Sequence, residues 1–408
     1  MIAAVPKYPV KMTMLRGPKS SNGGRPRATS VRKDAAVPHA LHLSSDGVGT
    51  SMRHCISNLA MTLRDIGIDA SASISGPNGD DVWHVGPDTD RSPWISIRWN
   101  TDFESNHSMW ASRRVVLDVT DTWSWAMRDR VDGLNQHADL LVVPAKSNVH
   151  EFKNAGVEIP ISVVPFGVDS RVYHPDAPDW SIVETADWNW TPTEGTFLFL
   201  VAGMLNERKG VDVALEAFEQ AFDPREPVAL LVKNSVRDSG TSQIDTVAMK
   251  SRRGKVGLIE RHLDERSMSR LLSTADCFVN CHHREGFGLM PLQAMACGTI
   301  PIITAWDGPL SYANNHNSIL VPPSRIVKTT SILGVRDGID WAELDPSDVA
   351  RAMQQAYRKD TSEMKRNAIE TAASWSWKLS AMAFVKAIEA KISPVRRTDP
   401  TPDLGLQV

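Results

Sequence analysis

A strand, a glycine turn and a helix occur in this order twice along the chain, and no other pattern limits its fold so strongly. The first copy runs through the apolar segment 40–45, the turn "DGVGT" and a helix expected over 51–67. The second runs through the apolar segment 196–205, a basic loop and a helix expected over 210–222. Parallel α/β units begin in this way and bind ligands at the carboxyl ends of their strands. We therefore predict an α/β fold with two Rossmann-like domains that face a cleft.

Further periodic segments extend both units, and a chain of 408 residues is long enough for two domains. Strands are expected within 111–123, 137–145, 161–175, 228–234, 276–281, 299–304 and 318–323, and helices within 265–275, 289–297, 345–360 and 378–392. Segment 176–195 combines Pro, Gly and acids without periodicity, so we place the domain boundary there. The predicted division is a basic tail (1–36), an N-terminal Rossmann-like domain (37–178), a C-terminal Rossmann-like domain (179–375), a final helix (376–392) and a second tail (393–408).

Composition excludes several classes of protein. Four cysteines are too few and too clustered for a disulfide scaffold, and they favour a reducing compartment. The formal net charge of −3 gives no general attraction to polyanions. No apolar run approaches the ~20 residues of a membrane helix, and no signal peptide is visible. We therefore expect a cytoplasmic protein without a transmembrane segment.

The first 36 residues are nevertheless strongly basic, with eight Lys or Arg against the single acid Asp34. Ser, Gly and Pro interrupt the cations, which is typical of a disordered tail. The alternative is a basic arm that touches nucleic acid or an acidic acceptor.

The basic loop "GMLNERKG" leaves the first strand of the second unit. Gly203 permits a close backbone approach, and Arg208 and Lys209 place two cations just before a helix. Backbone N–H groups and mobile cations at such a position suit a diphosphate. The alternative is a solvated loop with surface cations.

A second motif, "REGFGLMPLQAMACGTIPIITAW", combines a carboxylate, a Gly-Phe-Gly turn and a small-residue helix. Glu285 stands before the turn and Gln293 one turn into the helix, so both side chains are expected to reach one ligand. Carboxylates and amides pair well with sugar hydroxyls, which both donate and accept hydrogen bonds. The alternative role of Glu285 is to complement the dipole of the following helix.

These segments resemble the retaining glycosyltransferases of the two-domain GT-B type, in particular the large family numbered four. That family carries a Glu, seven residues and a second Glu within a stretch like "EGFGLPxLEAMACGxPVI". Here Glu285 matches the first acid, and Gln293 stands at the second. Four further segments are similar in order and spacing: "DLLVVPAKSNVHEFKNAGV", "ISVVPFGVDSRVYHP", "LNERKGVDVALEAF" and "TAWDGPLSYANNHNSILV".

The resemblance implies that the N-terminal domain holds the acceptor, that the C-terminal domain binds the nucleotide sugar, and that the final helix crosses back to the first domain. It also implies a role for each residue of the site. Glu285 would contact the donor sugar, Gln293 the ribose hydroxyls and Lys209 the diphosphate. Where the family carries an Arg this chain has Met204, and Arg208 would substitute for it. The donor-binding residues that we predict are Gly47, Gly49, Gly203, Arg208, Lys209, Glu285, Gly286, Phe287, Gly288, Leu289 and Gln293.

A third catalytic residue is expected in the N-terminal domain. Many members of the family carry a His there, beside the donor sugar. The matching segment "VVLDVTDTW" offers Asp121 instead, for which capping the next helix is an equal alternative. We therefore expect Glu285, Lys209 and Asp121 to be catalytic.

The implied reaction moves a sugar from a UDP-sugar or GDP-sugar to an acceptor, with retention of anomeric configuration and without a metal ion. The acceptor could be a protein, a glycan, a lipid or a modified nucleic acid. Two other activities stay open: a sugar-nucleotide-binding protein with a degenerate donor site, and an epimerase or hydrolase on the same scaffold. Cys277, Cys281, His282 and His283 could be drawn as a metal cluster, but core thiols fit a strand better, with the histidines near the donor pocket.

Overall fold

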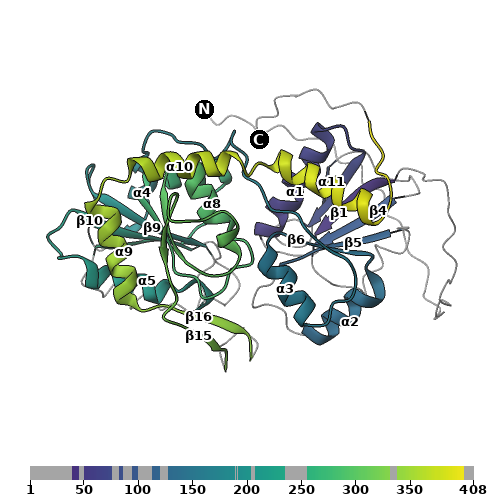
Figure 1. Cartoon of the computed structure of the whole chain (residues 1–408). Coiled ribbons are helices and arrows are strands. Elements are labelled where there is room, and N and C mark those ends of the chain that lie inside the picture. Colours follow the sequence, from purple (N-terminus) through teal and green to yellow (C-terminus); the bar gives the residue numbers. More distant parts are fainter. Residues whose placement is uncertain are drawn as a thin grey trace, which may run out of the picture. The chain divides into compact units, whose positions relative to one another are not determined.

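The computed structural model contains two seven-stranded, mostly parallel β-sheets, each covered by helices (Figure 1). It describes residues 39–45, 50–75, 82–85, 94–99, 113–119, 127–188, 190, 192–203, 207–234, 255–330 and 338–398. The predicted basic tail, residues 1–36, lies outside the described residues. Among the described residues, no helix has the length and apolar character needed to cross a membrane.

The first sheet has the strand order β3-β2-β1-β4-β5-β6-β7. All neighbours are parallel except β2 and β3, which are antiparallel. Its elements are β1 (Ala40–Ser45), α1 (Thr50–Asp65), β2 (Ala70–Ser75), β3 (Val82–Val85), β4 (Trp94–Trp99), β5 (Arg113–Leu117), α2 (Met127–His137), β6 (Leu140–Val143), α3 (Lys146–Asn154) and β7 (Ile161–Val163). The predicted strands and first helix are present.

The second sheet has the order β14-β13-β12-β9-β10-β11-β8, with only β8 antiparallel to its neighbour. Its strands are β8 (Asp187–Trp188), β9 (Phe197–Gly203), β10 (Val228–Asn234), β11 (Val256–Ile259), β12 (Cys277–Asn280), β13 (Ile300–Thr304) and β14 (Ile319–Val321). A separate antiparallel pair is formed by β15 (Arg325–Lys328) and β16 (Asp340–Glu343). Helical elements are α4 (Trp180–Glu184), η2 (Glu207–Lys209), α5 (Val211–Ala221), α7 (Glu265–Thr274), α8 (Leu289–Ala296), η3 (Gly308–Ser311), α9 (Pro346–Arg358), α10 (Ser362–Ala373) and α11 (Trp377–Lys391).

The central strands of the second sheet are buried on both faces. All seven residues of β10 are buried, which explains why its first five residues form the apolar run "VALLV". On one face, Val201 and Val232 belong to a core with α5 and α9. On the other, Leu200 and Leu231 belong to a core with α7 and α8. These two layers hold the carboxyl ends of β9, β10 and β12 in fixed positions.

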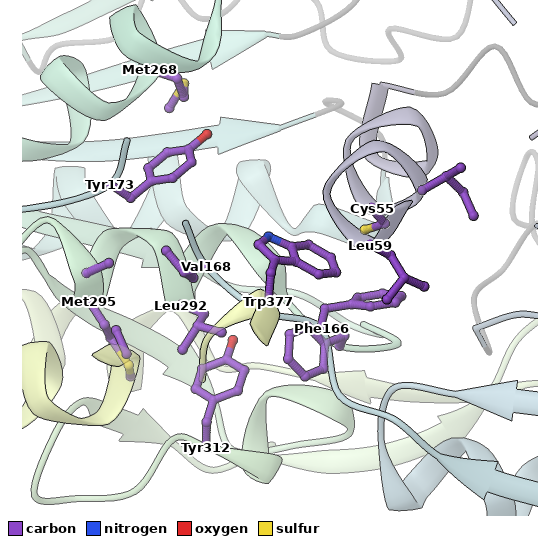
Figure 2. Packing of buried hydrophobic residues seen from close by; sticks show 14 of the residues in the cluster. Cys55, Leu59, Phe166, Val168, Tyr173, Met268, Leu292, Met295, Tyr312 and Trp377 are labelled. Atoms are coloured by element: carbon purple, nitrogen blue, oxygen red, sulfur yellow. The ribbon is translucent and has the colours of Figure 1, made fainter. Parts of the chain in front are cut away.

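The C-terminal helix α11 packs against α1 of the first sheet, which agrees with the predicted crossover. Figure 2 shows Trp377 at the start of α11 near Cys55 and Leu59 of α1. Its indole also lies 6.0 Å, between ring centroids, from Phe166. The buried apolar cluster around Trp377 therefore includes residues from both ends of the chain.

Two predicted loops are more ordered than their composition indicates. Segment 176–195, the predicted boundary, contains α4 and the edge strand β8. The predicted tail 393–408 begins as a paired segment: the N–H of His39 donates to Pro394 O at 3.0 Å, and the N–H of Arg396 donates to His39 O at 2.8 Å. Backbone pairing that holds such a segment leaves no composition signal.

Candidate active site

The loops that leave β9 and β12 meet at the carboxyl edge of the second sheet. Arg208 and Lys209 come from η2, directly after β9, and Glu285 follows β12. Lys209 Nζ donates a hydrogen bond to Glu285 Oε2, and Arg208 Nη1 lies 3.3 Å from the same oxygen. Arg208 Nη1 also donates to Arg284 O at 2.9 Å. The two predicted motifs, 76 residues apart, therefore form one charged cluster.

The three charged side chains of this cluster are mostly buried but keep some contact with solvent. The side chains of Arg208, Lys209 and Glu285 are 10%, 16% and 14% exposed. Burial by itself would raise the pKa of Glu285, but the positive charges of Lys209 and Arg208 outweigh it and lower the pKa to about 2. Glu285 is therefore a carboxylate at neutral pH, and the three side chains together carry one positive charge.

His282 lies beside this cluster and is fully buried. Its Nε2–H donates to the backbone oxygen of Trp306 at 3.1 Å, which leaves Nδ1 unprotonated and without a hydrogen-bond partner among the described residues. Burial lowers the pKa of His282 to about 4, although the charge of Glu285 acts in the opposite direction. The imidazole is therefore neutral at pH 7.

His283 is directed elsewhere. Its ring stacks on Trp341 with a centroid distance of 4.7 Å, and Nδ1 donates to Ala342 O at 2.6 Å. Cys277 and Cys281 are buried in the apolar core, as predicted for core thiols. Among the described residues, no group of His, Cys, Asp or Glu side chains is arranged to hold a metal ion.

Two glycines with positive φ allow the segments around the cluster to pack closely. Gly210 has φ 56°, and an added Cβ would lie 2.1 Å from Cys281 O. Gly288 has φ 83°, and an added Cβ would lie 2.8 Å from the hydroxyl of Tyr312 and 3.5 Å from Glu285 Cγ. Only glycine adopts these dihedrals readily and leaves room for these neighbours. The close packing of the two loops therefore explains why Gly210 and Gly288 are glycines.

The remaining predicted donor residues surround Glu285 or lie outside the described part of the chain. Gly203 ends β9, and an added Cβ there would lie 3.7 Å from Lys209 Cε. Gly288 caps α8, whose first residue is Leu289, and Gln293 lies one turn further with only 3% of its surface exposed. Gly286 and Phe287 connect Glu285 to this helix, with Phe287 in the core. Gly47, Gly49, Asp121 and Met204 lie outside the described residues.

Two buried polar residues at the carboxyl edge of the second sheet, Lys233 and Asn280, were not predicted as site residues. Lys233 pairs with Ala202 across β10 and β9, and Phe278 of β12 pairs with Leu200 of β9. Since side chains alternate along a strand, Asn280 lies level with Ala202 on the side opposite Lys233. Lys233 and Asn280 therefore flank a small alanine on one face of the sheet edge.

Both side chains are enclosed, at 3% exposure for Lys233 and 6% for Asn280. Lys233 Nζ donates to Asn234 O at 3.1 Å, and burial lowers the pKa of Lys233 to about 8. Asn280 Nδ2 has no hydrogen-bond partner within the described part of the chain. A polar "KN" at the end of the apolar run "VALLV" was the signal that could have found Lys233.

The C-terminal unit matches the model of a known family. Residues 183–360 match the family described as Glycosyl transferases group 1. This segment contains Arg208, Lys209, Glu285 and Gln293. The match confirms the resemblance that the motifs indicated.

Two curated relatives are similar in sequence. A D-inositol 3-phosphate glycosyltransferase from Segniliparus rotundus is 28% identical over 165 residues, which cover 40% of this chain and 35% of that protein. A glycogen synthase from Mycobacterium tuberculosis is 25% identical over 359 residues, which cover 84% of this chain and 78% of the relative.

Solved structures share the fold. Sucrose-phosphate synthase from Thermosynechococcus elongatus has a TM-score of 0.65 at 14% identity, and the match covers 86% of this chain and 99% of that one. Anabaena HepE in complex with UDP-glucose has a TM-score of 0.63 at 13% identity, with 86% and 100% covered. These likenesses confirm the predicted GT-B architecture. Over residues 183–360, the chain is therefore similar to the family described as Glycosyl transferases group 1.

Proposed function

We propose that this chain transfers a sugar from a nucleotide diphosphate sugar to an acceptor, with retention of configuration at the anomeric carbon. The observation that carries the proposal is the contact of Lys209 and Arg208 with Glu285 at the carboxyl edge of the second sheet. A diphosphate needs cations, and a sugar needs hydrogen-bond acceptors beside it. This cluster offers both within one ion-paired group.

The cations stabilise the leaving group. As the bond between the sugar and the diphosphate breaks, negative charge grows on the diphosphate, and fixed positive charges in a shielded site stabilise it strongly. We propose that Lys209 and Arg208 supply this charge without a metal ion. Lys209 moves from Glu285 to a phosphate oxygen, because an ammonium can exchange one acceptor for another at little geometric cost.

Glu285 then faces the sugar. A carboxyl group with a pKa of about 2 is no proton donor at neutral pH, so it accepts hydrogen bonds from sugar hydroxyls. Its negative charge also favours the positive charge that develops on the sugar ring in the transition state. Gln293 would hold the ribose through its amide, without the stronger bond that a carboxylate makes.

UDP-glucose is the first donor to test, because the structure of Anabaena HepE is described in complex with it. The names of the curated relatives point to two acceptors for the same test, D-inositol 3-phosphate and glycogen. Protein, lipid and modified nucleic acid acceptors are the next to test, the last because residues 1–36 are strongly basic.

The test is an NMR assay of the purified full chain with UDP-glucose, GDP-glucose and ADP-glucose, each with and without acceptor. Retention predicts a product whose anomeric configuration equals that of the donor. Release of free glucose without acceptor would indicate a hydrolase, and conversion of one donor into another an epimerase. Binding without any reaction would favour a sugar-nucleotide-binding protein, in keeping with Gln293 at the position of a carboxylate.

A further inference from the structure

The loop between β13 and η3 holds the Glu285 segment from both sides. The N–H of Glu285 donates to Asp307 Oδ2 at 3.3 Å, and the N–H of Gly308 donates to Glu285 O at 3.0 Å. One residue earlier in the loop, Trp306 O accepts the bond from His282 Nε2. Both backbone groups of Glu285 are thereby fixed by neighbouring residues of one loop.

The backbones of the two segments pack closely at Gly308. An added Cβ on Gly308 would lie 2.3 Å from Gly286 O and 2.6 Å from the backbone nitrogen of Phe287. No other residue type fits at Gly308 unless the Glu285 segment moves. The loop is therefore a rigid neighbour of the carboxylate site.

Asp307 adopts a conformation that its residue type avoids. Its dihedrals are φ 63° and ψ −146°, and it is the only residue other than glycine with positive φ in the described part of the chain. These angles lie close to a region that only glycine adopts readily, and strained residues of this kind gather at functional sites. A glycine at 307 would relax the backbone, so the aspartate side chain must serve another purpose.

The charge of Asp307 is also unfavourable on its own. Burial raises the pKa of Asp307 most, and the negative charge of Glu285 also raises it. The positive charge of Arg284 and hydrogen bonds from Ser147 and the N–H of Glu285 lower it only in part. The structure therefore places a second carboxylate beside Glu285 in spite of strain and repulsion. What this carboxylate does locally is accept the N–H of Glu285.

We infer that Asp307 is a positioning residue, which fixes the backbone of Glu285 so that its carboxylate meets the donor sugar. This inference rests on the proposed function. Lys209 and Arg208 orient the free carboxylate, but a bound diphosphate would draw both cations toward itself. The backbone contacts with Asp307 and Gly308 then keep Glu285 in place, and small displacements of a positioned group weaken catalysis strongly.

Two variants of the full chain test the inference. Asp307→Gly relaxes the backbone and removes the acceptor, whereas Asp307→Asn keeps an oxygen that can accept the N–H of Glu285. We expect Asp307→Gly to weaken UDP-glucose binding about tenfold while UDP binding changes less than about twofold, because only the sugar meets Glu285. Asp307→Asn should keep most of the preference that wild type shows for UDP-glucose over UDP. Equal binding of UDP-glucose by wild type and Asp307→Gly, or equal weakening of both ligands, would overturn the inference.

A second measurement separates this inference from the proposed function. Amide hydrogen exchange of the ligand-free protein should be at least about tenfold faster at Glu285 in Asp307→Gly than in wild type, because the N–H loses its acceptor. Asp307→Asn should exchange like wild type. Unchanged exchange in Asp307→Gly would contradict the positioning role. A wild type that binds neither ligand would overturn the proposed function, and the exchange result would still decide whether Asp307 holds Glu285.

Discussion

Single residues at the site combine opposing effects, and the balance decides their chemistry. Burial opposes the charge on Glu285, yet two cations keep its pKa at about 2. Burial also opposes the charge on His282, and there it prevails, with a pKa of about 4. Neighbouring buried groups therefore hold different charges at pH 7, one negative and one neutral.

Replacing Glu285 by Gln should separate nucleotide binding from sugar transfer. The variant removes the negative charge that now pairs with Lys209 and Arg208, so residue 285 competes less with a diphosphate for both cations. We expect UDP to bind several-fold more tightly and sugar transfer to fall by at least about a hundredfold. Calorimetry with UDP and the NMR assay measure the two effects. Weaker UDP binding in Glu285→Gln would contradict this account of the ion pair.

The neutral state of His282 predicts how stability depends on pH. The unfolded state takes up a proton with the ordinary pKa of 6.5, while the folded state takes it up only near pH 4. Between these values the unfolded state binds more protons, so stability falls as the pH drops from 6.5 to 4. The loss should reach roughly 3 kcal/mol.

Urea unfolding of wild type and His282→Asn across this range measures the loss. The stability difference between the two proteins should be largest at pH 7 and narrow toward pH 4. The exposed His316→Asn is the control, with no such narrowing expected. A constant difference between wild type and His282→Asn would show that His282 does not titrate in this way.

At the scale of elements, apolar runs and glycine turns predict most of the second sheet. The strands β9, β10 and β12 are continuous apolar runs, and their positions in the sequence follow directly from this. The predictions missed β2, β3 and β4 of the first sheet and β11 of the second. In β2, "ASASIS" alternates small polar residues with small apolar ones, and in β4, "WISIRW" lies between prolines and polar residues that read as a loop.

The residues of the charged cluster were also predictable from sequence motifs, whereas the buried polar residues around them were not. Glu285 and Lys209 stand in motifs with a recognisable order of residues. Asp307 and Asn280 are placed by tertiary contacts that leave no signal in the sequence near them, and Lys233 is marked only by the polar pair that ends the apolar run of β10. Their strain, burial and register exist only once the strands are assembled.

A side chain at the turn before α8 should cost much more stability than one at an open turn with a similar φ. Gly288 and Gly195 both have positive φ, at 83° and 92°. An added Cβ at Gly288 would meet Pro309 Cγ at 2.7 Å and the hydroxyl of Tyr312, whereas Gly195 has nothing within 4 Å. We expect Gly288→Ala to lower the free energy of unfolding by about 2–4 kcal/mol and Gly195→Ala by about 1 kcal/mol. Equal losses in urea unfolding would contradict the close packing at Gly288.

At the scale of the molecule, the C-terminal helix joins the end of the chain to its first helix. Trp377 is 4% exposed in a cluster that includes Phe166 and residues of α1, whereas Leu379 on the same helix is 50% exposed. We expect Trp377→Ala to destabilise the protein by about 3–5 kcal/mol and Leu379→Ala by less than about 1 kcal/mol. Thermal and urea unfolding provide the comparison. Similar losses for both variants would contradict the central packing of Trp377.

The central claim is that the cluster of Arg208, Lys209 and Glu285 binds a nucleotide diphosphate sugar. The most direct measurement is calorimetric titration of UDP-glucose into wild type, Lys209→Ala and the exposed control Lys359→Ala. We predict micromolar binding to wild type and Lys359→Ala, and at least tenfold weaker binding to Lys209→Ala, because removing one of two diphosphate cations costs on the order of 1–3 kcal/mol. Equal binding by all three proteins would contradict the claim.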